Sequence, residues 1–106
     1  MLIRAAIAFS LLSLLAADAK ADSEARNGKD FVRITAQACT NEKVLANITG
    51  RGESPLDYRA AQAEFNGEAF AACWTPDYKT GMVQLRYDDG DRGELSVRAF
   101  VPVQGI

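Results

Sequence analysis

The chain contains no histidine, and this absence removes the commonest general base at neutral pH and the commonest metal ligand in proteins. Only two cysteines and one tryptophan occur among its 106 residues. No Gly-x-Ser-x-Gly elbow, phosphate-binding glycine-rich loop or Cys-x-x-Cys pair is present. Zinc sites of the cysteine–histidine type are therefore excluded. We expect no cofactor, and we expect that the protein is not an enzyme.

An excess of either charge is also lacking. Lysine and arginine number 12 against 14 aspartates and glutamates, which gives a formal net charge of −2. The two signs are interspersed, and no basic run suggests a phosphate backbone or an anionic membrane as the partner. We therefore expect no binding to nucleic acid.

Long apolar runs are absent except at the start, where residues 1–21 have the three parts of a secretory signal peptide. Met1–Arg4 carries a positive charge, Ala5–Ala17 is uncharged, and small residues lead up to Ala21. This run is too short to cross a bilayer, which takes roughly 20 apolar residues. The cleavage region contains no cysteine, so we expect no lipoprotein anchor. We predict cleavage after Ala21 and export to the periplasm or the exterior, without a membrane anchor.

The rest of the chain is small. We expect a flexible lead-in over residues 22–30 and a single domain over residues 31–106. A domain of this size buries only about 60–65% of its unfolded surface, so a covalent staple would help it. Cys39 and Cys73 should form a disulfide in an oxidising compartment, with two buried free thiols as the alternative. Closing a loop of about 35 residues should contribute roughly 3–4 kcal/mol.

A strand and then a helix are expected near the start of the domain. The segment Phe31–Thr35 is rich in β-branched and aromatic residues. Thr40 or Asn41 is a suitable helix N-cap. Apolar residues then recur at helical spacing from Val44, and the helix should end near Gly50.

Two interpretations fit the segment Arg59–Trp74. Its first half contains helix-forming residues, yet Asn66-Gly67 is the favoured pair for a two-residue hairpin turn. We favour the hairpin over a helix that ends at Gly67. The hairpin register would place Ala63 opposite Phe70, Ala61 opposite Ala72, and Arg59 opposite Trp74. Cys73 would then point away from the apolar face, so either both faces are covered or a bulge reverses the alternation.

The C-terminal part alternates more clearly. Met82–Tyr87 and Glu94–Val101 have strand periodicity, and Asp88–Gly93 has the composition of a turn. We therefore predict an α+β fold. A short N-terminal strand and helix would pack on an antiparallel meander of about three to four strands, with one disulfide.

The turn supplies the candidate metal ligands Asp88, Asp89 and Asp91. Oxygen-rich loops bind calcium, and paired carboxyl groups can act as acid and base, with Glu94 as a further member. However, the spacing matches no calcium loop, and Asp-Gly is common turn chemistry. We therefore favour a solvated turn and predict no metal site.

Trp74 is the only tryptophan and directly follows a predicted disulfide cysteine. An aromatic anchor at a protein interface, made of Trp74 with Phe70 and Arg59, is one interpretation. A core aromatic residue beside the disulfide is the other, and a small domain favours it because it needs every large side chain.

One resemblance concerns the order of these features. The chain resembles small exported proteins of proteobacterial genomes and their prophages. The resemblance lies in Cys39–Val44, then Ala71-Ala72-Cys73-Trp74, then a strand followed by Asp88-Asp89-Gly90-Asp91. The similarity covers about Phe31 to Phe100. It implies a Gram-negative periplasm as the destination and implies no mechanism.

These observations favour a non-catalytic interaction module that binds an unknown protein or cell-envelope component. An inhibitor of a wall-degrading enzyme would be one form of it. The alternative is a small carboxylate-dependent hydrolase acting on cell-wall material, and a third hypothesis is a calcium-stabilised structural domain.

Overall fold

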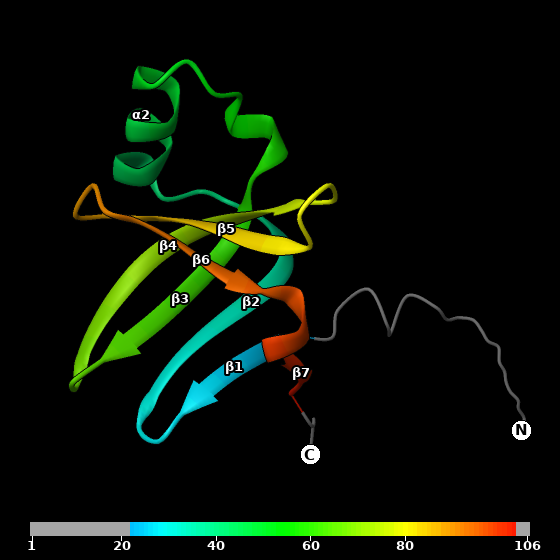
Figure 1. Cartoon of the computed structure of the whole chain (residues 1–106). Coiled ribbons are helices and arrows are strands. Elements are labelled where there is room, and N and C mark those ends of the chain that lie inside the picture. The colour runs from blue at the N-terminus through cyan, green and yellow to red at the C-terminus, as the bar shows by residue number, and fades with distance from the viewer. Residues whose placement is uncertain (1–21, 104–106) are drawn as a thin grey trace, which may run out of the picture.

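The computed structural model describes residues 22–103, and over these residues the protein is mostly β (Figure 1). Within this range, seven antiparallel strands form one sheet in the order β6-β5-β4-β3-β2-β1-β7, and a single α-helix, α2, lies against it. The strands are β1 (Ser23–Asn27), β2 (Asp30–Ala38), β3 (Arg59–Phe65), β4 (Glu68–Asp77), β5 (Met82–Tyr87), β6 (Arg92–Ser96) and β7 (Val101–Pro102). The helix α2 is Glu42–Gly50, and two 3-10 turns are η1 (Pro55–Asp57) and η2 (Val97–Ala99).

The predicted α+β fold with a meander of about three to four strands is wrong. The N-terminal strand is not a separate element, because β2 lies inside the sheet between β1 and β3. Residues 22–30, expected as a flexible lead-in, contain β1 and its turn into β2. The sequence does not predict β1 because the strand has no large apolar residue. Its buried side chain is Ala25, whereas Glu24 faces outward and pairs with Arg33 at 2.7 Å.

The sheet curls into a half-barrel because its two edge strands are neighbours in the chain. β6 and β7 are joined by η2, and β7 pairs with β1 (Figure 1). The strand expected over Glu94–Val101 therefore ends at Ser96, whose side chain accepts a hydrogen bond from the Arg98 N–H at 3.2 Å. Val97 then lies outside the sheet pattern and is 53% exposed.

The hairpin of β3 and β4 is confirmed in the predicted register. Asn66 has φ 53° and Gly67 has φ 80°, as a type I′ turn requires. Both residues therefore occupy the left-handed region, which asparagine and glycine tolerate best. The helix alternative for this segment is excluded.

The predicted helix is also confirmed as α2. The Asn41 side chain caps it by accepting a hydrogen bond from the Val44 N–H at 3.0 Å. Val44 and Ile48 are fully buried, since they lie one helical turn apart and face the sheet.

Apolar side chains cover parts of both faces of the sheet. The inner face, inside the curl, holds the main core: Val32, Ile34, Ala61, Ala63, Ala72, Val83 and Leu85. The outer face holds a smaller core under α2: Cys39, Val44, Ile48, Tyr58 and Cys73. The predicted Cys39–Cys73 disulfide is confirmed, with Cα atoms 5.7 Å apart. Cys73 therefore points away from the main core because both faces of the sheet are covered, and its own face lies under α2.

The segment 1–21, predicted to be a signal peptide, lies outside the described residues. Of the helices within residues 22–103, none is long and apolar enough to cross a membrane.

Candidate functional site

The predicted binding residues Arg59 and Trp74 are direct neighbours across β3 and β4. Both are engaged with the backbone of β2. The Trp74 Nε1–H donates to the Thr35 carbonyl at 2.8 Å, and Arg59 Nη1 donates to the Ala36 carbonyl at 2.9 Å. Trp74 is half-buried against the inner core. These contacts lie where the register of β2 against β3 shifts. The two side chains therefore stabilise the β2 backbone at that irregularity.

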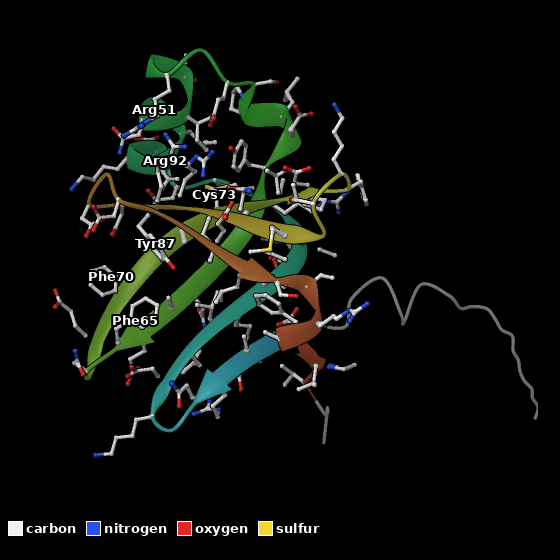
Figure 2. The ribbon with its side chains drawn as sticks, viewed as in Figure 1. Arg51, Phe65, Phe70, Cys73, Tyr87 and Arg92 are labelled. Carbon is white, nitrogen blue, oxygen red and sulfur yellow. A yellow bond between two sulfur atoms is a disulfide. The ribbon has the colours of Figure 1, made fainter. Side chains whose placement is uncertain are left out.

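Phe70, the third predicted binding residue, lies farther along β4 and belongs to a different cluster. Its ring packs with those of Phe65 and Tyr87, with centroids 6.0 Å from Phe65 and 6.2 Å from Tyr87. The Phe65 and Tyr87 centroids are 6.1 Å apart. We call Phe65, Phe70 and Tyr87 the aromatic trio. Figure 2 shows these side chains gathered at one end of the curled sheet.

The structure therefore divides the predicted patch and adds two residues that sequence reasoning missed. The predicted hairpin register already places Phe65 on the same face as Phe70, although Phe65 is not among the predicted binding residues. Tyr87 could not have been found, because its place beside Phe70 depends on the pairing of Ala72 with Tyr87 between β4 and β5.

The aromatic trio lines a small pocket. This pocket, of about 120 Å³, is bounded by the trio together with Asp89, Asp91 and Arg92. A second cavity, of about 300 Å³, also borders Phe65 and reaches Ala25, Val32, Leu95 and Ala99. Phe65 therefore contributes to both the small pocket at the β5–β6 turn and the wider cavity that β1 and η2 also line.

Tyr87 is held by a close approach to the neighbouring strand. A Cβ atom at Gly93 would lie 3.3 Å from the edge of the Tyr87 ring, so glycine leaves the room that the ring occupies. Burial raises the pKa of the Tyr87 hydroxyl, and the charges of Asp89 and Asp91 raise it further. The two carboxylates therefore impose a negative potential on the pocket.

The weak metal candidates Asp88, Asp89 and Asp91 lie in the turn between β5 and β6. The Asp89 carboxylate accepts a hydrogen bond from the Asp91 N–H at 2.9 Å, which is the ordinary stabilisation of such a turn. Across residues 22–103, no three aspartate, glutamate, cysteine or histidine side chains are grouped so that they could hold a metal ion.

A charged cluster occupies the outer face beside the disulfide. Arg86 pairs with Cys73 in the sheet and donates from Nε and Nη2 to the two Glu53 carboxylate oxygens, at 3.2 and 3.1 Å. The Tyr58 hydroxyl donates to the same Glu53 carboxylate at 2.8 Å. The hydrogen bonds from Arg86 lower the pKa of Glu53, while burial and then the hydrogen bond to Glu53 raise the pKa of Tyr58 to about 12.

This outer-face cluster borders an open cleft of about 630 Å³ that is also lined by Tyr78 and Lys79. Its polar groups already satisfy one another, and Glu53 is held ionised, which disqualifies it as a general acid. The arrangement can fix the loop that carries Glu53 against the sheet. We therefore regard the aromatic pocket as the better candidate for binding.

Comparison with known proteins found no matching family model, no matching curated protein and no matching solved structure.

Proposed function

We propose that the protein is a small exported binding module that contacts a protein or cell-envelope partner and carries out no catalysis itself. An inhibitor of a wall-degrading enzyme is one form that such a module takes. The observation that carries this proposal is the partly buried aromatic trio, which lines a small pocket beside the β5–β6 turn. Aromatic side chains that line a surface pocket are typical anchors of protein interfaces.

Two further observations support the proposal. The disulfide suits an oxidising compartment, as the predicted leader and the resemblance to exported proteobacterial and prophage-associated proteins require. The charged cluster at Glu53 and Arg86 is a closed set of mutual partners and offers no group poised for proton transfer.

The alternative of a carboxylate-dependent hydrolase receives no comparable support. Glu94 accepts a hydrogen bond from Gln84 Nε2 at 2.6 Å on the outer face. Asp89 and Asp91 line the aromatic pocket together, but both come from the same turn, joined by the Asp91 N–H to Asp89 hydrogen bond, and so do not face each other across it. A glycosidase requires two carboxyl groups that flank the same bond from facing positions.

A photo-cross-linking residue placed in living cells would test the binding module. Glu68 is exposed and lies opposite Phe65 in the sheet, so a benzophenone amino acid at position 68 would report on the mouth of the pocket. We expect one defined cross-linked partner from position 68. The control is position 56, where Leu56 is 93% exposed and lies in η1, outside the aromatic pocket. The absence of any cross-linked product from position 68 would contradict the proposal.

A further inference from the structure

We infer that the pocket formed by the aromatic trio and the β5–β6 turn takes a basic side chain, lysine or arginine, from a partner protein. This inference rests on the proposed function as a binding module and names the chemistry that the module recognises. Its basis is the combination of three aromatic side chains and two carboxylates around one small space.

The ring geometry suits a cation. The Phe65 and Phe70 planes are inclined at 44° to each other, whereas the Tyr87 ring packs edge-to-face with both, at 74° and 70°. A positive group within roughly 6 Å of a ring centroid is attracted by the negative face of the ring. Because the Phe65 and Phe70 centroids are 6.0 Å apart and their planes are inclined at only 44°, a cation seated between these two rings can lie within that reach of both faces.

The charges at the rim have the matching sign. Asp89 and Asp91 both line the pocket, and their effect on the pKa of Tyr87 shows that their field reaches the phenol. Arg92 is the cation among the lining residues, but it pairs with Arg86 in the sheet and so shares the outer face. Figure 2 shows Arg92 near Arg51, toward α2, with the trio farther along the sheet. The aromatic side of the pocket therefore keeps a net negative character.

The size of the pocket limits the occupant. A space of about 120 Å³ holds the end of one side chain, since a single water takes about 30 Å³ in the liquid. A short basic peptide would bind through the rings and the acidic rim alone. A lysine or arginine on a folded partner gains the same attraction and also brings neighbouring surface against the hairpin ends at Asn66-Gly67 and Asp89-Gly90. The acidic rim would also speed the encounter with a basic surface.

Ring NMR on the full domain provides the direct test. The probes are three blocked tripeptides: Gly-Lys-Gly, Gly-Arg-Gly, and Gly-Lys-Gly with the lysine acetylated. We expect saturable shifts of the Phe65, Phe70 and Tyr87 ring resonances with the first two peptides and none with the acetylated one. Equal shifts with the acetylated peptide, or no shifts with any peptide, would overturn the inference.

Two variants and one control variant locate the interaction. Asp91→Asn removes one rim charge from a side chain that makes no hydrogen bond with another described residue, and it should weaken lysine-peptide binding by about threefold. Asp57→Asn changes the net charge equally on η1 and should leave the affinity unchanged. Phe65→Leu keeps an apolar side chain but removes a ring face, and it should weaken binding by about fivefold. Equal affinity in all three variants would place the peptide elsewhere and end the proposal.

The two proposals can fail separately. A partner cross-linked from position 68 while the tripeptides fail to bind would reject the basic-side-chain pocket and leave the binding module intact. Selective binding of the basic tripeptides with no cross-linked partner would support the pocket chemistry and reject the proposed function.

Discussion

Arg86 is a charged residue type in a buried place, with only 7% of its surface reaching solvent. The alternation of β5 predicts correctly that Arg86 points away from Val83 and Leu85. From alternation alone, however, the Arg86 side chain would be expected to be exposed to solvent. The loop between α2 and η1 covers it instead and supplies Glu53 as its anionic partner. A buried guanidinium needs such a partner because its desolvation is costly.

We expect Glu53→Gln to lower the free energy of unfolding at pH 7 by about 1–2 kcal/mol, a value reduced by the partial exposure of Glu53. The pKa of Glu53 is lowered in the folded state, so its contribution is complete above its ordinary pKa of 4.5 and is lost as the pH falls through the lower folded value. The difference between wild type and variant should therefore shrink in acid.

Urea unfolding at pH 7 and at about pH 3 would measure this change. Glu68→Gln is the matched control, because Glu68 is exposed and makes no hydrogen bond to another described side chain. A difference between the Glu53 variant and wild type that is the same at both pH values would show that the charge of Glu53 is not the cause.

At the scale of single elements, local chemistry accounts for much of the structure. The Asn66-Gly67 turn sets the register of β3 and β4, because a two-residue loop leaves one way to pair the flanking strands. The cap at Asn41 and the spacing of Val44 and Ile48 define α2. β1 shows the limit of this reasoning, because its pairing with β2 gives no alternating apolar signal that a reader of the sequence could use.

Asn41→Ala should destabilise the protein by about 1 kcal/mol, since the Val44 N–H would lose its acceptor at the start of α2. Asn47→Ala makes the same substitution at an exposed position inside α2 and should be neutral or slightly stabilising, because alanine is the better helix former. Thermal unfolding of both variants measures the effect. Equal losses at the two positions would mean that the cap contributes nothing of its own.

At the scale of the whole molecule, the disulfide joins elements that local pairing does not connect. Cys39 follows β2, Cys73 lies in β4, and both are covered by α2, so the bridge fixes the helix-bearing end of the sheet. The opposite end, with the aromatic pocket, has no such covalent tie among the described residues.

Replacing both Cys39 and Cys73 by alanine should lower the free energy of unfolding by about 3–4 kcal/mol, because the bridge closes a separation of 34 residues. Urea unfolding of the variant should match that of wild type under reducing conditions, and a reductant should not affect the variant further. A loss below about 1 kcal/mol would contradict the chain-entropy argument for this bridge.

The sequence by itself determined the hairpin of β3 and β4, the capped helix, the disulfide pair and the direction of alternating side chains in β5. Each of these follows from residues close together in the chain, or from the only two cysteines present. The tertiary structure alone decided that β1 joins the sheet, that β6 turns into η2 so that the sheet curls, and that Tyr87 meets Phe65 and Phe70. These outcomes depend on long-range strand register, whose free energy is spread over many weak contacts that no short segment encodes.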